Sequence, residues 1–271
     1  MTHGSLFSGI GGFDLAAQWM GWDNVFHCEW NEFGQQVLKH HFPKSISYDD
    51  ITKTDFSIHR GQIDILTGGF PCQPYSTAGN RLGKDDERHL WPEMLRAIRE
   101  IKPRWIVGEN VLGLINWSEG LVFQEVQSDL EAEGYEVQPY VLPAASVGAP
   151  HKRDRVWFVA HSDSIGLEGG MYESGRERKV SRQYATTLHP RKTRDCWENF
   201  PTQPPIYNGN DGIPTRLDLI SVPKWRIESV KAGGNAIVPQ VALQIFKAVE
   251  QYEEIDSNKL NAKEFNYDKN F

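Results

Sequence analysis

The sequence has few cysteines and no long apolar run. Its 271 residues include three cysteines, Cys28, Cys72 and Cys196, which lie far apart and form no CxxC pair. This spacing argues against a zinc site and against a secreted disulfide framework, and it favours a reducing compartment. No stretch approaches the roughly 18 apolar residues of a membrane span, and the first residues do not resemble a targeting signal. We therefore expect a soluble, cytoplasmic protein with no membrane partner.

Positive charge is also scarce, because the formal net charge is −7. That total argues against a nucleic-acid partner, since contacts with phosphates supply most of the affinity that does not depend on sequence. The segment 171–194 is an exception, with seven Lys or Arg residues against two Glu, a local excess of five positive charges. This basic cluster is either a solvated loop or a surface that binds phosphates.

Apolar periodicity indicates strands that alternate with helices. Strands are expected from Ser5, at 25–28, 63–67, 105–108, 135–142 and 156–160, and helices after the glycines at 9–12, around 33–38, and at 90–101 and 238–249. This alternation predicts an α/β fold with a mainly parallel sheet and right-handed crossovers. Residues 161–228 lack clear periodicity and are expected to form a small irregular second lobe. Residues 253–271 are polar, and we expect a flexible tail there.

Cys72 follows one of these predicted strands directly. The apolar run Ile63-Asp64-Ile65-Leu66-Thr67 leads into Gly68-Gly69-Phe70-Pro71-Cys72-Gln73-Pro74-Tyr75-Ser76. The thiol is therefore expected at the carboxyl edge of the sheet, where open α/β sheets bind their ligands. An isolated cysteine is more often a small, unreactive core residue, so the neighbouring segments must decide between the two interpretations.

The glycine turn after the first predicted strand indicates a bound ligand. Gly9 and Gly11 allow close approach of the backbone, and the following helix N-terminus favours polar or anionic groups. Asp14 follows instead of the third glycine of the dinucleotide fingerprint, which disfavours a nicotinamide oxidoreductase. Glu29 ends the second strand, where an acid commonly accepts hydrogen bonds from ribose hydroxyls, although a surface charge is the alternative. Asp50-Ile51 offers a carboxylate and an apolar wall for an adenine ring.

Charged residues are expected at two further strand ends. Glu109 ends the strand beside the one that leads to Cys72, and a buried acid there would have a raised pKa and could donate to a ring nitrogen. An ordinary strand-end acid is the alternative. Arg153 and Arg155 alternate along an extended segment and are expected on one side of it, suited to an anion or a carbonyl oxygen. Exposed pairing with Asp154 is the competing interpretation.

In this order, the segments resemble the cytosine-C5 DNA methyltransferases, in particular the compact bacterial and phage members, which use S-adenosylmethionine. The resemblance covers residues 5–160 and 233–250. The segments that carry it are Phe7-Ser8-Gly9-Ile10-Gly11-Gly12-Phe13, Glu29, Asp50-Ile51, Gly69-Phe70-Pro71-Cys72-Gln73, Glu109-Asn110-Val111, Arg153-x-Arg155 and Gly234-Asn235-Ala236-Ile237-Val238-Pro239-Gln240.

The resemblance implies a Rossmann-like, S-adenosylmethionine-dependent methyltransferase sheet and a role for each segment. Cys72 would add to C6 of a cytosine flipped out of double-stranded DNA, Glu109 would bind N3 and the exocyclic amine, and Arg155 would reach O2 with support from Arg153. Gln73 would line the space near the flipped base, and Ser76 would contact a phosphate. The cofactor-binding residues would be Phe7, Gly9, Gly11, Glu29, Trp30, Asp50, Ile51, Gly69, Pro71, Leu90, Asn235 and Ala236. The reaction would leave S-adenosylhomocysteine and require no metal.

The same resemblance predicts how the chain is divided into domains. Residues 1–160 and 229–252 would form the catalytic and cofactor-binding domain, and residues 161–228 would form the lobe that recognises the DNA target. We expect a monomer, with any cognate restriction endonuclease acting separately. A tRNA cytosine-5 methyltransferase is one alternative, although its Cys-Phe-Thr signature does not occur here. A DNA-binding relative without catalysis is another, and the joint presence of Cys72, Glu109 and Arg155 argues against it.

Overall fold

The computed structural model describes residues 1–71, 90–162 and 222–267, with the side chains of the last range described from 227 to 256. Cys72, Gln73 and Ser76 lie outside these residues. So do the basic cluster at 171–194 and almost all of the predicted lobe at 161–228. The described residues contain the sheet, the helices that cover it and most of the predicted cofactor-binding positions.

The described part of the chain contains a seven-stranded mixed sheet with the order β3-β2-β1-β4-β5-β7-β6. Strands β1 to β5 pair in parallel, and β7 runs antiparallel to both of its neighbours. The α/β sheet predicted from periodicity is confirmed. The strands are β1 (Thr2–Leu6), β2 (Asp23–Cys28), β3 (Ile46–Tyr48), β4 (Ile65–Gly68), β5 (Trp105–Val111), β6 (Glu136–Pro143) and β7 (Asp154–His161).

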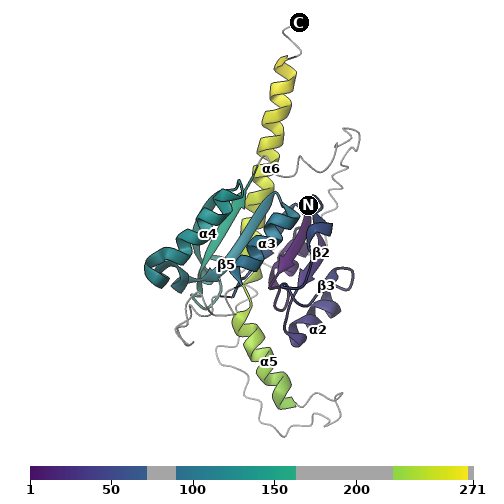
Figure 1. Ribbon diagram of the computed structural model, residues 1–271, viewed down its shortest axis with the longest axis vertical. Coiled ribbons are helices and arrows are strands. Elements are labelled where there is room, and N and C mark those ends of the chain that lie inside the picture. Colours follow the sequence, from purple (N-terminus) through teal and green to yellow (C-terminus); the bar gives the residue numbers. More distant parts are fainter. Residues whose placement is uncertain (72–89, 163–221, 268–271) are drawn as a thin grey trace.

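Helices cover both faces of this sheet (Figure 1). On one face α3 and α4 pack over a core that includes Leu66, Ile106 and Phe158, and on the other α1 and α6 pack over Ile65 and Val107. Successive strand residues thus face opposite cores, as the two-residue period of a strand requires. The helices are α1 (Gly12–Trp19), α2 (Glu32–His41), α3 (Trp91–Ile101), α4 (Leu121–Ala132), α5 (Val222–Asn235) and α6 (Pro239–Tyr267), with 3₁₀ segments η1 (Ser57–His59), η3 (Leu112–Gly120) and η4 (Ala144–Val147).

The strand directions bring the predicted site segments to one edge of the sheet. The parallel strands β1, β2, β3, β4 and β5 all end at this edge, whereas the antiparallel β7 begins there. Val111 at the end of β5 is paired with Arg155 near the start of β7. The residues after β4, the end of β5 and the start of β7 are therefore neighbours in space although they are far apart in sequence.

Helix α6 runs into the segment 253–271, for which flexibility stays a prediction. Helix α6 continues to Tyr267, and Glu253 accepts hydrogen bonds from Arg104 Nη1 and Trp105 Nε1, each at 2.7 Å. These bonds fix the helix against the start of β5. None of the helices that the structure describes combines the length and the apolar character needed to cross a membrane.

We predict that Phe246→Ala will destabilise the fold strongly. Phe246 is fully buried on α6, and the centroid of its ring lies 4.8 Å from that of Trp22. Removing a buried ring leaves a cavity and should lower the free energy of unfolding by about 3–5 kcal/mol, measured by urea denaturation. Lys247→Ala, an exposed neighbour on the same helix, should change it by less than about 0.5 kcal/mol. Equal effects of the two substitutions would show that α6 does not pack on this sheet.

Candidate active site

Glu109 and Arg155 form an ion pair at the carboxyl edge of the sheet. Arg155 Nε lies 3.0 Å from Glu109 Oε1. In the antiparallel register Glu109 faces Trp157 and Val111 faces Arg155, so the ion pair is a diagonal contact between side chains on one face of β5 and β7. Glu109 is only 8% exposed, which places an acid and its cation in a largely dry environment.

Burial controls the protonation of Glu109. Desolvation raises the pKa of this carboxyl group to about 7, although the positive charges of Arg155 and Arg153 act in the opposite direction. Its other oxygen, Oε2, lies only 3.3 Å from the position that a Cβ atom on residue 69 would take. Gly69 therefore leaves room for the carboxyl group beside the end of β4. A group with this pKa can hold or release a proton near neutral pH.

Asn110 fixes the backbone that leads to Cys72. Its side-chain Nδ2 donates to the carbonyl oxygen of Phe70 at 3.0 Å, and its own Oδ1 accepts from the amide of Val111 at 2.9 Å. Asn110 is 2% exposed, so these bonds are shielded from water. Pro71 is the last described residue of this segment. The predicted positions Cys72, Gln73 and Ser76 follow it, outside the described residues.

The backbone conformation of Arg153 differs from the one that the sequence predicted. We expected Arg153 and Arg155 to alternate along one extended strand, but Arg153 has a φ of 42° and β7 begins only at Asp154. The Arg153 side chain stays near Glu109, but its guanidinium binds the segment before α6 instead of pairing with the acid. Its Nη2 donates to the carbonyl oxygens of Gly234, at 2.9 Å, and Ala236, at 2.5 Å. Arg155 thus contacts the acid, whereas Arg153 holds the segment that joins α5 to α6.

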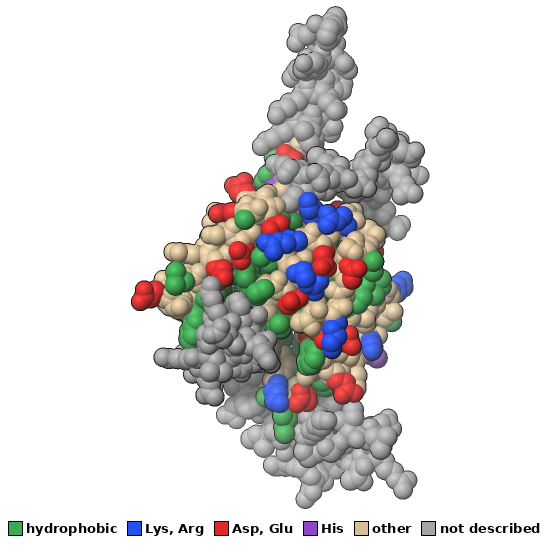
Figure 2. Space-filling model, viewed as in Figure 1, with side chains coloured by type: hydrophobic (Ala, Val, Ile, Leu, Met, Phe, Trp, Pro, Cys, Tyr) green, Lys and Arg blue, Asp and Glu red, His purple; other side chains and the backbone are tan. Residues whose placement is uncertain are grey.

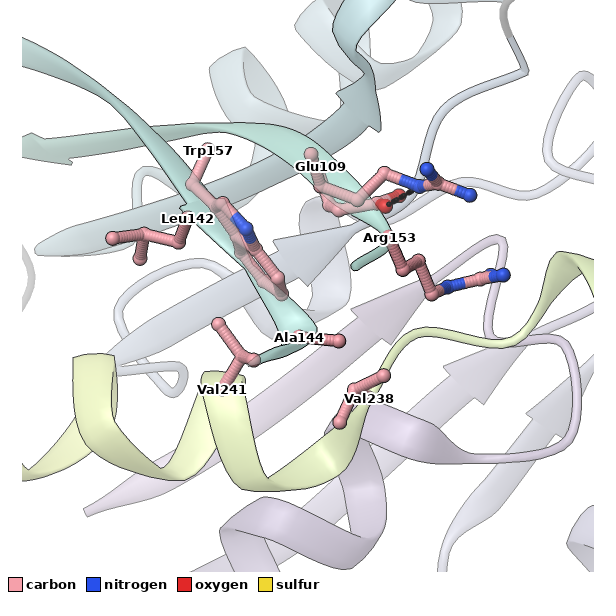
Figure 3. Close-up of a pocket in the computed structure, with 8 residues that line it drawn as sticks. Glu109, Leu142, Ala144, Arg153, Trp157, Val238 and Val241 are labelled. Carbon is pink, nitrogen blue, oxygen red and sulfur yellow. Dashed lines mark ion pairs between the residues drawn. The ribbon is translucent and has the colours of Figure 1, made fainter. Parts of the chain in front are cut away.

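The three charged residues nevertheless line one small pocket (Figure 3). Its remaining wall is apolar and comes from three separate parts of the chain. Trp157 is 2% exposed and contributes a large flat surface next to the ion pair. This wall excludes water and so strengthens the electrostatic interactions inside the pocket. The other lining residues are Leu142, Ala144, Val238 and Val241.

A second group of predicted residues surrounds the glycine turn after β1. Glu29, at the end of β2, accepts from the amide of Gly9 at 2.7 Å through Oε2 and from the amide of Asn31 at 2.8 Å through Oε1. Each carboxylate oxygen retains a further lone pair for a ligand hydroxyl. Phe7 and Gly9 both have positive φ values, 51° and 58°, so the backbone turns sharply between β1 and α1.

This region fits a nucleoside-containing cofactor. Apart from its two chain neighbours, no atom of the described residues lies within 4 Å of the position that a Cβ on Gly9 would take, so there is open space beside the turn. Trp30 is 73% exposed at the end of β2, and an aromatic ring in that state can stack on a base. Asp50 follows β3 at the same edge, but its carboxylate already accepts from Thr52 N and Oγ1 and pairs with Lys53. The carboxylate of Asp50 therefore stabilises the turn at residues 50–53, and a ligand could use only its remaining lone pairs.

One other predicted segment lies near this region. Ile237 contacts the start of α1, because a Cβ on Gly12 would lie 2.5 Å from Ile237 Cγ1, and so Asn235 and Ala236 lie close to the glycine turn. Leu90 is half-buried just before α3. Among the described residues, no three His, Cys, Asp or Glu side chains gather as a metal site would require.

Sequence reasoning missed two residues of the site. Asn110 was part of a recognised segment, but no pattern indicated that its amide would bind the Phe70 carbonyl. Trp157 lies two residues after Arg155, so alternation along a strand places both side chains on one face. This spacing predicts a place for Trp157 beside Glu109 only when β7 is known to pair with β5. Both roles depend on which strands are neighbours.

The sequence matches a model of the family described as C-5 cytosine-specific DNA methylase over residues 1–208. It is 33% identical over 221 residues to the Type II methyltransferase M.NgoBI of Neisseria gonorrhoeae, covering 76% of this chain and 68% of that protein. It is 36% identical over 182 residues to M.PspPI of Psychrobacter sp. (strain TA137), covering 66% of this chain and 42% of that protein. The chain therefore belongs to the C-5 cytosine-specific DNA methylase family.

Solved structures agree with this assignment. A crystal structure described as a DNA modification methyltransferase encoded within a prophage (E. coli) shares 26% identity and a TM-score of 0.52, over 60% of this chain and 47% of that one. The S. pombe Dnmt2 methyltransferase has a TM-score of 0.50 at 22% identity, over 60% of this chain and 51% of that one, and shows a common fold. The chain spans about two fifths of the length of M.PspPI and about half of these solved chains.

We predict that Glu109→Gln will remove a pH dependence of stability. The pKa of Glu109 rises from its ordinary value of 4.5 to about 7 on folding, so the folded chain binds this proton more tightly. The resulting stabilisation is present below pH 4.5 and is lost as the pH rises to about 7. Between pH 4.5 and 7, the free energy of unfolding of the wild type should fall by on the order of 2 kcal/mol relative to that of Glu109→Gln. Urea denaturation at each pH measures both values.

The comparison between the two proteins isolates Glu109. Burial also raises the pKa of Asp14 to about 7, but Asp14 is present in both proteins and its effect cancels in the difference. A wild type that gains stability relative to the variant between pH 4.5 and 7 would contradict the prediction. That result would mean that Arg155 outweighs burial and lowers the pKa of Glu109.

Proposed function

We propose that this chain is the catalytic part of a DNA (cytosine-5-)-methyltransferase that uses S-adenosylmethionine. The observation that carries the proposal is the ion pair between the buried Glu109 and the half-buried Arg155 beside the end of β4, the strand that leads to Cys72. A protonated carboxyl group, which donates through its O–H and accepts through its carbonyl oxygen, matches N3 and the exocyclic amine of cytosine, and the neighbouring guanidinium can donate to O2. The family membership supports the same reaction.

The proposed substrate is a cytosine flipped out of double-stranded DNA. The C6 atom is inaccessible inside a base-paired stack, so the base must leave the duplex before a side chain can add to it. Gln73 would line the space near the extruded base, and Ser76 would contact a phosphate. The lobe at 161–228, which includes the basic cluster, would contact the DNA and read its sequence.

The cofactor would bind along the carboxyl ends of β1, β2 and β3. When bound, S-adenosylmethionine supplies an electrophilic methyl group on a sulfonium centre. The glycine turn would approach it through the backbone, Glu29 would accept from its ribose, Trp30 would stack on its adenine, and Asn235 would contact it from the segment before α6. The open space beside Gly9 and the exposure of Trp30 support this arrangement. The other proposed contacts are Phe7, Asp50, Ile51, Gly69, Pro71, Leu90 and Ala236.

The chain's own residues would then activate the base. The Cys72 thiolate forms a bond to C6, and the displaced electron pair makes C5 nucleophilic. Negative charge that develops on the ring is stabilised by a proton from Glu109 at N3 and by Arg155 at O2. After C5 has received the methyl group, its proton passes to solvent water, the electron pair of that C–H bond restores the C5–C6 double bond and expels Cys72 as a thiolate, and N3 returns its proton to Glu109. A Glu109 pKa near 7 suits both donation and release of a proton.

The name "Type II methyltransferase" of the relatives indicates a biological setting. We propose that the protein modifies DNA as a monomer, with a cognate restriction endonuclease as a separate protein.

We predict that the chain will transfer labelled methyl groups from S-adenosylmethionine to double-stranded DNA and not to tRNA. Cys72→Ser should reduce turnover by at least about 10³-fold, because a hydroxyl group cannot replace the thiolate as the nucleophile, and it should leave cofactor binding within about twofold. Scintillation counting of purified DNA and tRNA measures the first result, and calorimetric titration with S-adenosylhomocysteine measures the second. Cys28→Ser is the matched control, because Cys28 is buried in the core at the end of β2.

Other outcomes would distinguish the alternatives. Methylation of tRNA alone would assign a tRNA cytosine-5 methyltransferase. Binding of DNA without methyl transfer by the wild type would indicate a relative that has lost catalysis. Bisulfite sequencing of genomic DNA from cells that express the chain would identify the methylated sites, and unmodified DNA under good expression would contradict the proposal.

A further inference from the structure

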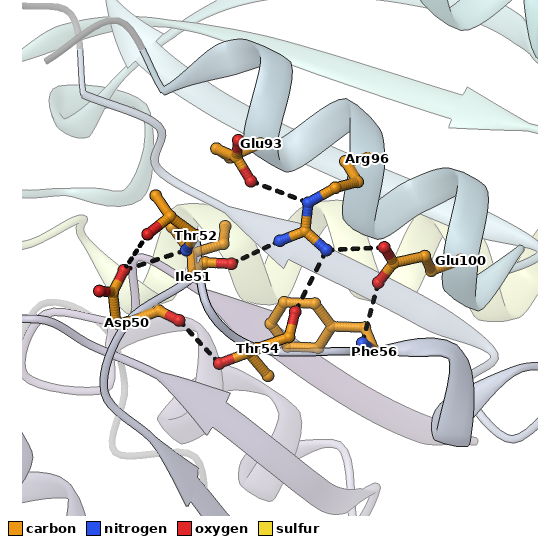
Figure 4. A network of polar contacts seen from close by, with 8 residues as sticks. All are labelled: Asp50, Ile51, Thr52, Thr54, Phe56, Glu93, Arg96 and Glu100. Atoms are coloured by element: carbon orange, nitrogen blue, oxygen red, sulfur yellow. Dashed lines mark hydrogen bonds and ion pairs between the residues drawn. The ribbon is translucent and has the colours of Figure 1, made fainter. Parts of the chain in front are cut away.

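Outside the proposed active site, Arg96 donates hydrogen bonds to two acids and two backbone carbonyls (Figure 4). It lies on α3, and its guanidinium donates to two backbone carbonyls of the loop that follows β3. Nη2 donates to Ile51 O at 2.5 Å, and Nη1 donates to Thr54 O at 3.1 Å. The planar, rigid arrangement of donors in arginine suits this type of two-point contact, which a flexible ammonium group cannot reproduce.

Two acids on the same helix complete the network. Glu93 Oε2 accepts from Arg96 Nε at 2.8 Å, and Glu100 Oε1 accepts from Arg96 Nη1 at 2.6 Å. Glu100 also accepts from the amide of Phe56 at 2.9 Å through its second oxygen. Helix α3 therefore holds the loop through three backbone groups, at residues 51, 54 and 56. The acids also orient the guanidinium, which lowers the entropy lost when it binds the carbonyls.

The loop held in this way carries Asp50 and Ile51. Asp50 forms a compact turn in which its backbone carbonyl accepts from Thr54 Oγ1 at 2.7 Å and its carboxylate accepts from Thr52. Ile51 is 6% exposed and packs in the core beneath the carboxyl edge. Arg96 binds the carbonyl of Ile51 itself, so its position determines where both residues stand relative to Trp30 at the next strand end.

We propose that Arg96 is a positioning residue for the adenosyl part of the cofactor. The inference rests on the proposed function, because the 50–56 loop can contact the adenine only if S-adenosylmethionine binds at this edge of the sheet. Arg96 does not contact the ligand in this proposal. It holds the loop in the conformation that receives the adenine, so that binding does not have to order the loop first.

Arg99 offers a matched comparison on the same helix. Among the described residues it forms an ion pair with Glu133 alone, from Nε to Oε1 at 2.6 Å, and its side chain is 54% exposed, against 32% for Arg96. Its partner Glu133 directly follows α4, so Arg99 contacts that helix end. A general effect of removing a positive charge from α3 should appear in both substitutions, whereas a positioning effect should appear only at Arg96.

The test is calorimetric titration of the full-length chain with S-adenosylhomocysteine. Arg96→Met should raise the Kd by about tenfold or more, because the loss of several hydrogen bonds leaves the loop unordered in the free protein. The KM for S-adenosylmethionine should rise in parallel, and kcat should change less. Affinity for double-stranded DNA, measured by fluorescence anisotropy, should remain within about twofold of the wild type. Arg99→Met should leave all of these values within about twofold.

A purely structural role would give a different pattern. If Arg96→Met lowers the melting temperature but the folded variant binds S-adenosylhomocysteine as the wild type does, the inference is wrong. If Arg96→Met does not fold, Arg96→Lys answers the question, because it keeps the charge facing Glu93 and Glu100 but loses the two-point contact. It should raise the Kd by about threefold or more, and an unchanged Kd would overturn the inference. A wild type that binds no S-adenosylhomocysteine would overturn the proposed function itself.

Discussion

The structure of the site depends on the reversal of one strand. Because β7 runs antiparallel to β5, it begins at the edge where β5 ends. Arg155 is paired with Val111, and its side chain contacts Glu109, two residues earlier on β5. A parallel β7 would have carried Arg155 to the opposite edge of the sheet. The reversal also determines protonation, since a carboxyl group that is buried against β7 and α6 loses most of its hydration. One topological choice thus supplies both the charge partner and the raised pKa of Glu109.

The dry environment of this pair requires distant parts of the chain. Trp157 comes from β7, whereas Val238 immediately precedes α6 and Val241 lies in its first turn, far later in the sequence. Arg153 connects the same two regions, because it lies just before β7 and binds carbonyls of the segment before α6. The C-terminal helix is therefore part of the site as well as part of the core. Glu253 extends this contact to the far end of β5 by binding Arg104 and Trp105.

The sequence predicted the elements of this fold better than the contacts between them. Alternating and helical periodicities located most strands, α3 and the start of α6, because burial of one side or stripe leaves a regular pattern. Arg153 was misplaced because a single left-handed residue before a strand leaves no such pattern, and α5 was missed because Pro223, Gly233 and Gly234 suggest irregular structure. Contacts from Asn110 and Arg96 to backbone carbonyls were also invisible, since every residue offers a carbonyl and only the tertiary structure selects one.

The predicted cofactor-binding carboxylates share a feature that changes how their roles should be understood. Glu29 accepts from two backbone amides, and Asp50 accepts from Thr52 and pairs with Lys53, so each already has partners within the protein. Their first contribution is to fix the loops at the ends of β2 and β3, and a ligand would use only the lone pairs that remain. Specific binding at this edge then depends on loop geometry more than on free charges. Residues that set the geometry from a neighbouring helix consequently matter as much as residues that touch the ligand.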